Sequence, residues 1–159
     1  MCLVFFISFI KNFEAETYGN DIEIVINMKI TYVPPYYPPH FGGMENVIHA
    51  ISKGMSKRGH NVTVVSSETK EKQMINYGKL NVIKVPINFK VFNTPVSLSL
   101  EKRLMAIDCE LYHTNAYPVF YSDITSIVAK KKKMPFVLQW HMDPRETSIY
   151  KQNILAKAL

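Results

Sequence analysis

The chain has 159 residues and a mass of 18.3 kDa, which is room for one ordinary domain but not for two. Hydrophobic residues make up 47% and charged residues 20%, proportions that argue against a disordered or fibrous protein. The two cysteines cannot form a disulfide framework, and their small number fits a reducing compartment. The net charge of +6 attracts anions, whether nucleic acid, phosphorylated substrates or an acidic membrane surface.

Residues 1–27 differ in composition from the rest of the chain. They carry one lysine and four acidic residues, whereas the remainder carries 18 basic and nine acidic residues. The apolar run MCLVFFISFI has about ten residues, and a membrane-spanning helix needs about 20. It also lacks the preceding positive charge and the small-residue cleavage site of a secretory signal. We therefore expect residues 1–27 to be an N-terminal extension that need not belong to the native domain, which covers residues 28–159.

From Met28 onward, short β-type runs alternate with helical patterns. Strands are predicted at residues 29–33, 61–66, 81–85, 111–113 and 136–140, and helices at 43–58, 100–107, 118–133 and from about 147. Residues 86–99 have a less regular pattern. This alternation predicts a Rossmann-like, three-layer α/β domain with a parallel sheet.

Apolar positions indicate which faces of these elements are buried. The last predicted strand, FVLQW, is continuously apolar, as expected for a strand covered on both faces. The first helix has apolar residues at helical spacing: Met44, Val47, Ile48, Ile51 and Met55. The apolar side of the helix at 118–133 is expected to consist of Phe120, Ile124, Ile127 and Val128.

Ligands of open parallel sheets bind beyond the carboxyl ends of the strands, which selects the loops at residues 34–43, 66–72, 114–118 and 141–146. The first loop, PPYYPPHFGG, is held extended by four prolines and ends in Gly42 and Gly43. These glycines leave backbone N–H groups at the positive end of a helix dipole, where a phosphate can bind; a tight strand-to-helix turn explains the pair equally well. The chain contains neither GxGxxG nor GxxxxGK[ST], so the NAD-binding and ATPase classes lack their usual motif.

Two histidines are expected to be structural. His60 follows Gly59 and is predicted to cap the turn from the first helix into the next strand. His49 lies in the middle of that helix, where we expect a solvated or internally bonded side chain instead of a ligand.

The order of the motifs resembles the N-terminal domain of family 4 glycosyltransferases, which have the GT-B fold. The run MKITYVPPYYPPHFGGMENVIHAISKGMSKRGHNVTVVSS has the family's Tyr/Pro-rich loop, its Gly-Gly pair, an acidic residue two places on and Arg-Gly-His. The run ELYHTNAYPVFYSDITSIVAKKKKMPFVLQWHMDP resembles the family's strand, histidine-containing loop, helix and Trp/Phe-His loop. The likeness covers residues 28–146.

This resemblance implies a retaining transfer of a sugar from a nucleotide-sugar to a glycan or lipid-linked acceptor, with no required metal or other cofactor. The chain would supply the acceptor-side half. Gly42 and Gly43 would approach the donor's phosphates, and His141 would reach the sugar at the reaction centre. Acceptor contacts are expected from Tyr37, His40, His113 and Asn115. Asn115 stands where the family frequently has a second histidine, and it keeps the capacity to hydrogen-bond a sugar hydroxyl.

The family's donor-binding half is not within these 159 residues. We therefore expect the isolated chain to be inactive unless a separate subunit supplies that domain. The alternative is a non-catalytic half-domain, either a truncated remnant or a scaffold subunit of a two-chain glycosyltransferase.

The location is expected to be cytoplasmic, with peripheral membrane contact as a further option. Lys130, Lys131, Lys132 and Lys133 can bind anionic lipid, although lysines at a helix end also interact favourably with the dipole. Nucleic acid is not an expected partner, because no recognised binding motif accompanies the basic charge.

Overall fold

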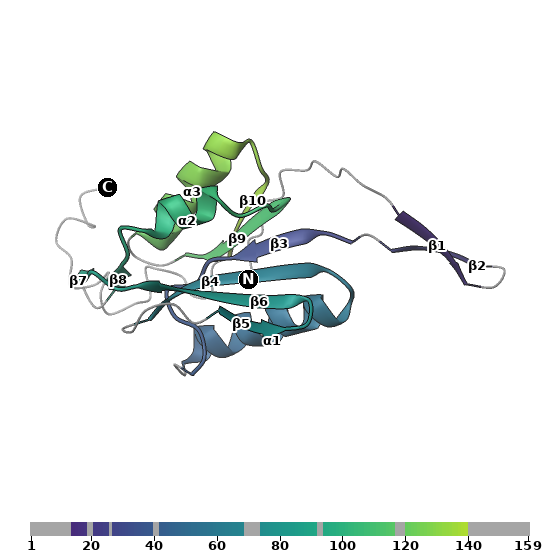
Figure 1. Ribbon diagram of the computed structural model, residues 1–159, viewed down its shortest axis with the longest axis horizontal. Coiled ribbons are helices and arrows are strands. Elements are labelled where there is room, and N and C mark those ends of the chain that lie inside the picture. The colour runs from purple at the N-terminus through teal and green to yellow at the C-terminus, as the bar shows by residue number, and fades with distance from the viewer. Residues whose placement is uncertain are drawn as a thin grey trace, which may run out of the picture.

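A central sheet covered by helices on both faces forms the body of the protein (Figure 1). The computed structural model describes residues 14–18, 21–25, 27–39, 42–68, 74–91, 94–116 and 120–139. The six-stranded sheet has the order β10-β9-β3-β4-β6-β5. Its strands are β3 (Lys29–Tyr32), β4 (Asn61–Glu68), β5 (Met74–Tyr77), β6 (Leu80–Pro86), β9 (Leu111–Asn115) and β10 (Phe136–Gln139). Five strands are parallel, which confirms the predicted Rossmann-like α/β class.

Three helices and two small hairpins complete the described structure. The helices are α1 (Gly43–Lys57), α2 (Leu100–Met105) and α3 (Tyr121–Lys132). One hairpin consists of β1 (Glu14–Tyr18) and β2 (Asp21–Val25), which pair with each other and lie apart from the main sheet in Figure 1. The other consists of β7 (Phe89–Val91) and β8 (Thr94–Val96). The second hairpin corrects our expectation of irregular structure over residues 86–99.

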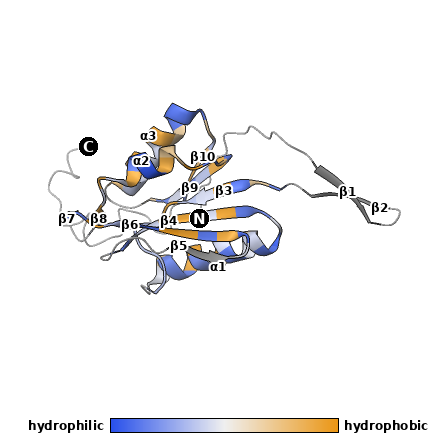
Figure 2. Ribbon diagram, in the orientation of Figure 1, coloured by the Kyte–Doolittle hydropathy of each residue, from blue (hydrophilic) through white to orange (hydrophobic). Residues whose placement is uncertain are grey.

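The two faces of the sheet support separate hydrophobic cores. Alternate residues of a strand point to opposite faces, so Val62 and Val64 of β4 pack on the α1 side whereas Val65 packs on the side of α2 and α3. Leu104 of α2 and Val128 of α3 are fully buried in the second core. Figure 2 shows hydrophobic residues concentrated in β4 and β6 and hydrophilic residues at the end of α3. This two-sided burial makes the domain a three-layer structure.

Helix α1 forms almost where the sequence predicts it. Its apolar stripe packs on the sheet through Ile48, which is 1% exposed, and through the partly buried Ile51 and Met55. The helix ends at Lys57, with Arg58 as its C-cap, because Gly59 follows with a φ of 96°, a conformation that glycine adopts readily. Val47 lies at the margin of the stripe and is 37% exposed.

Strand β5 was missed by the sequence analysis, which expected a purely parallel sheet. It pairs antiparallel with β6, and the two strands are joined by the tight turn at Gly78 and Lys79. Gly78 has a φ of 67°, which the turn requires. The segment MINY is short and carries no apolar alternation, so the glycine turn is its main sequence signal.

The predicted burial of two C-terminal elements also needs correction. Strand β10 lies at one end of the described sheet, and its four residues are half-buried instead of being covered on both faces. In α3 the buried face consists of Tyr121, Thr125, Val128 and Ala129. Ile127 is 44% exposed because it falls outside this i, i+4, i+7, i+8 stripe.

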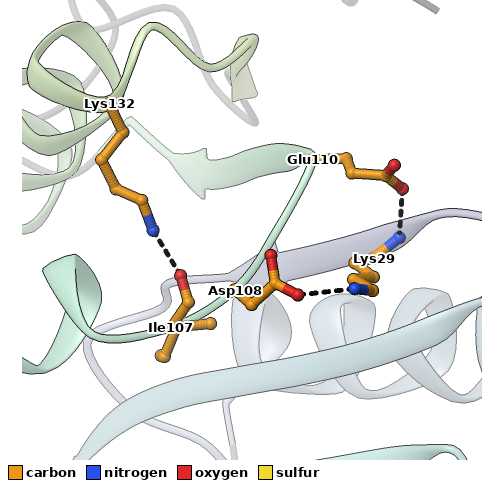
Figure 3. Close-up of polar contacts among 5 residues, drawn as sticks. All are labelled: Lys29, Ile107, Asp108, Glu110 and Lys132. Carbon is orange, nitrogen blue, oxygen red and sulfur yellow. Dashed lines mark hydrogen bonds and ion pairs between the residues drawn. The ribbon is translucent and has the colours of Figure 1, made fainter. Parts of the chain in front are cut away.

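Polar contacts tie together the amino end of the sheet, opposite the edge where ligands bind (Figure 3). Lys29 opens β3; its Nζ lies 2.5 Å from Oδ2 of Asp108, and its backbone N–H donates to the Glu110 carboxylate. The Lys29 ammonium lowers the pKa of Asp108, chiefly through the hydrogen bond between the two groups. Both partners are exposed, so this pair fixes register more than it adds stability.

His60 follows α1 and forms a hydrogen bond to the residue before β3, which confirms the prediction that it is a structural histidine. Its Nδ1 accepts the backbone N–H of Met28 at 3.2 Å, so the ring must be neutral at this atom. Partial burial lowers the pKa of His60, and the positive charges of Arg58 and Lys79 lower it further.

Acidification is expected to weaken this link. A histidine whose pKa is lowered by folding stabilises the protein fully above its unfolded pKa of about 6.5 and loses that contribution as the pH falls through the folded value. His60→Asn retains an acceptor that does not titrate in this range. Urea unfolding at pH 7 and pH 5 should therefore show a larger loss for the wild type, by up to about 1 kcal/mol. Equal losses in the two proteins would contradict this role.

Candidate functional site

The order of the strands reverses at β3, in the middle of the sheet. From β3 the chain passes through α1 to β4 and then to β6, and it later returns to the other side of β3 to add β9 and β10. Helices α2 and α3 cover the face opposite α1. In open α/β sheets, ligands bind outside the carboxyl ends of the strands where such a reversal occurs. The candidate site therefore lies at the carboxyl ends of β3 and β9.

His113 is positioned at this reversal by contacts with the strands on both sides. It lies on β9, and its ring centroid is 4.9 Å from that of Tyr32 on β3. Its Nε2 is 3.0 Å from Oε1 of Gln139 at the end of β10. The backbone joins the same strands, because the N–H of Val33 donates to the His113 carbonyl at 2.8 Å. The His113 ring is thus oriented at the strand ends and remains only half-buried.

Asn115 lies two residues further along β9, on the same face as His113. Its side chain is fully buried, and neither its Oδ1 nor its Nδ2 has a hydrogen-bond partner among the residues that the structure describes. The intervening Thr114 points to the opposite face, where its hydroxyl donates to the Val33 carbonyl at 2.7 Å. A buried amide without partners costs free energy, so it calls for an explanation such as a bound water or ligand. An amide that can both donate and accept fits a sugar hydroxyl.

Tyr37 anchors the proline-rich loop to α1. Its hydroxyl lies 2.9 Å from Oγ of Ser52 and 3.0 Å from Nδ1 of His49, and its side chain packs in the core on the α1 side. This bond confirms that His49 is satisfied within the domain. Tyr37 is only 3% exposed, so its phenol is placed to hold the loop and offers little surface to an acceptor.

Gly42 and Gly43 open α1, as the sequence predicts. Gly42 has an extended backbone with a φ of −160°, which any residue can adopt. A Cβ there would meet only the carboxylate end of the flexible Glu45 side chain, which could move aside. Gly43 has open space around the corresponding position. The Glu45 carboxylate thus sits near the positive end of the helix dipole, where a phosphate would also bind.

Lys84 is a buried cation that the sequence analysis did not identify. It lies on β6, is 3% exposed and donates from Nζ to the Tyr37 carbonyl at 2.9 Å. Burial lowers the pKa of the Lys84 ammonium, and the Glu68 carboxylate partly offsets this effect. Its sequence signal was the alternation of NVIKV, which places Lys84 on the same inward face as Val82.

Two of the predicted site residues, His40 and His141, lie outside the described residues, as do the predicted loop at 141–146 and the helix expected from about residue 147. The roles assigned to them remain predictions. Among the residues that the structure describes, no group of three His, Cys, Asp or Glu side chains is arranged to hold a metal ion.

The lysine cluster at the end of α3 is not uniformly available to a partner. Lys131 pairs with Glu101 of α2 at 2.6 Å. Lys132 is half-buried and donates to the Ile107 carbonyl and to the Tyr112 hydroxyl (Figure 3 shows the first contact). Lys130 and Lys133 are exposed. Across the described ranges, no helix is long and apolar enough to cross a membrane.

Comparison with known proteins identifies the class to which this fold and site belong. Residues 41–158 match the model of Glycosyltransferase Family 4, and the chain belongs to that family. It is 32% identical, over 136 residues, to O-antigen chain mannosyltransferase C of Escherichia coli. The match covers 82% of this chain and 34% of the relative, so the chain spans about a third of that protein's length.

Proposed function

We propose that this chain supplies the acceptor-side half of a retaining glycosyltransferase, which moves a sugar from a nucleotide-sugar to a glycan or lipid-linked acceptor. The observation that carries the proposal is the buried amide of Asn115, which has no hydrogen-bond partner within the described ranges and lies beside His113 at the reversal of strand order. Membership of glycosyltransferase family 4 supports the reaction class.

The reaction requires two things of the protein. The bond from the anomeric carbon to the diphosphate breaks, the diphosphate keeps the electron pair, and the acceptor oxygen forms the new bond as its hydroxyl proton passes to the departing diphosphate. Hydrogen bonds must therefore orient hydroxyl groups, and positive potential must stabilise the leaving diphosphate. We assign the first task to His113 and Asn115, and we assign His141 to the sugar at the reaction centre.

The backbone N–H groups at Gly42 and Gly43 are proposed to face the donor's phosphates. Because the Glu45 carboxylate lies against Gly42, it must move aside or be exchanged for the phosphate when the donor binds. We place the acceptor beside His113, with His40 as a further contact. From the likeness to family 4 glycosyltransferases we propose that transfer needs no metal, and that the positive charge comes from helix termini and from the donor-binding half.

Mannose activated as a nucleotide-sugar is the first donor to test, because the relative from Escherichia coli is named as a mannosyltransferase. The donor-binding half would come from the remainder of a longer protein or from a separate subunit. Without that half we propose that the 159-residue chain does not transfer sugar. A non-catalytic half-domain is the competing function: a truncated remnant predicts no transfer by the native protein, and a scaffold subunit of a two-chain glycosyltransferase predicts transfer that does not depend on His141.

The α2–α3 surface is a proposed contact with anionic lipid. Met105 and Ile127 are 42% and 44% exposed on these helices, and Lys102, Lys130 and Lys133 are exposed on the same two helices. Apolar side chains among lysines suit the interface of an acidic membrane. Binding to vesicles containing phosphatidylglycerol should fall with increasing salt, and salt-insensitive or absent binding would contradict this contact.

The decisive experiment uses the native protein purified from its own source, first by intact mass and then with radiolabelled nucleotide-mannose and a membrane extract as acceptor. We expect label to be transferred, and His141→Ala to reduce turnover about 100-fold or more with an unchanged melting temperature. His60→Asn, which alters a histidine at the opposite end of the sheet, serves as the matched control and should retain activity. Near-normal turnover of His141→Ala would remove its assigned role.

A further inference from the structure

Lys84, on β6, fixes the proline-rich loop through contacts with Tyr37. Its Nζ donates to the Tyr37 carbonyl, lies 3.9 Å from Oε2 of Glu68 and is 5.7 Å from the centre of the Tyr37 ring. The lysine side chain is 2% exposed, whereas that of Glu68 is 36% exposed. The ammonium is therefore enclosed by the loop, the ring and the ends of β4 and β6.

Burying the charged ammonium of Lys84 lowers the stability of the fold, because the charge loses its hydration. Lys84 follows Leu80 and Val82 along the same face of β6, and both of those residues belong to the core on the α1 side. A buried ammonium needs partners for three N–H groups, and in the part of the chain that the structure describes one carbonyl lies at hydrogen-bond distance. An apolar side chain of similar length would fill this place without desolvating a charge. The presence of a lysine here is therefore explained by the contacts that its ammonium makes.

Lys84 fixes one end of a loop segment that is bonded at two points of Tyr37. The Tyr37 hydroxyl is fixed by Ser52 on α1, and the Tyr37 carbonyl is fixed by Lys84 on β6. A hydrogen bond between backbone groups also joins the loop to β4: the N–H of Ser67 donates to the Pro35 carbonyl at 2.9 Å. The loop leads directly to Gly42 at the start of α1.

We propose that Lys84 is a positioning residue, which fixes the Tyr37 carbonyl and thereby sets where the Gly42–Gly43 segment stands at the carboxyl edge of the sheet. This inference rests on the proposed function for its consequence in catalysis, since Gly42 and Gly43 are there assigned to the donor. The structural part of the inference, that Lys84 fixes the loop, depends on the contacts of Lys84 alone.

The clamp is tested in the 159-residue chain by residue-specific amide hydrogen exchange. The Ser67 amide reports whether the loop is seated, because its acceptor is the Pro35 carbonyl. In Lys84→Met we expect exchange at Ser67 to accelerate about tenfold or more. Exchange at Val62, in the same strand but bonded to the Lys79 carbonyl, should be unchanged, and the melting temperature should be unchanged or higher.

Lys84→Arg, which keeps a charged donor, should restore at least part of the protection at Ser67. Lys53→Met, at an exposed position of α1, is the matched control and should behave as the wild type. Unchanged exchange at Ser67 in Lys84→Met would overturn the proposal, as would equal acceleration at Val62. If Lys84→Met does not fold, the exchange at Ser67 in Lys84→Leu, a smaller apolar side chain that also lacks a donor, decides by the same criteria.

The catalytic consequence is measured separately in the native, transfer-active protein. Lys84→Met should raise the donor KM about tenfold or more with little change in melting temperature, and Lys53→Met should leave KM unchanged. An unchanged KM would show that the clamp has no effect on the site. If the wild-type protein transfers no sugar, the proposed function fails, and the exchange measurement still decides whether Lys84 positions the loop.

Discussion

Replacing Asn115 by leucine is expected to raise the free energy of unfolding by about 1–3 kcal/mol. The amide is fully buried and neither polar atom is bonded to a described part of the chain, whereas leucine has the same branching without the need for partners. Most substitutions of buried residues destabilise a protein, so a gain would mark Asn115 as a residue kept for a ligand instead of for the fold. Urea unfolding of the 159-residue chain measures the change.

The neighbouring Thr114 provides a matched comparison for Asn115. Its hydroxyl is equally buried but donates to the Val33 carbonyl, so Thr114→Val should lower the free energy of unfolding by about 1 kcal/mol. In a transfer-active preparation, Asn115→Leu should reduce kcat/KM for the acceptor by about tenfold to 100-fold. If Asn115→Leu instead destabilises the domain as much as Thr114→Val does, the amide has a structural partner and its assignment to the acceptor fails.

Replacing Tyr112 by alanine is expected to lower the free energy of unfolding by about 3–5 kcal/mol. Tyr112 is fully buried at the centre of the core under α2 and α3, and its hydroxyl donates to the Leu104 carbonyl at 2.7 Å. Burial raises the pKa of this phenol, so it remains a donor throughout the neutral range. Alanine would leave a large cavity, and the Leu104 carbonyl would keep the backbone N–H of Ile107 as a donor.

The control for Tyr112 is Ile127→Ala on the exposed side of α3. Ile127 is 44% exposed, so its truncation should change the free energy of unfolding by no more than about 0.5 kcal/mol. Thermal unfolding followed by circular dichroism separates the two variants. A loss of less than about 1 kcal/mol for Tyr112→Ala would mean that the core can collapse around the missing ring.

Local patterns were sufficient to predict most elements of the fold. The helix that became α1 has a strong apolar stripe and a glycine at its end, and the parallel strands have the apolar character that burial on both faces produces. Prediction failed where tertiary placement decides burial. The sequence FVLQ has the character of a central strand, and only the order of the strands reveals that β10 stands at the end of the described sheet.

The sequence predicted which strand ends form the candidate site. It did not predict which side chains contact one another there. The likeness to family 4 glycosyltransferases pointed to His113 and Asn115 from sequence alone. The pairing of His113 with Gln139, and that of Lys84 with the Tyr37 carbonyl, join residues 26 and 47 positions apart, and no local pattern reports such pairs. For the same reason, the sequence could not show that the Asn115 amide lacks a partner while Thr114 has one.

The central place of β3 in the sheet has a consequence for the order of folding. During synthesis, β3 emerges first of the six strands, and its partner β9 emerges much later; Lys29 and Glu110, which meet at this pairing, are 81 positions apart. Until β9 is made, one edge of β3 has no neighbour and is open to pairing with other chains. The pairing of β3 with β9 also creates the reversal where Tyr32 meets His113. The candidate site thus forms with the most distant pairing of the sheet, so a ligand that binds there would report that β9 has paired with β3.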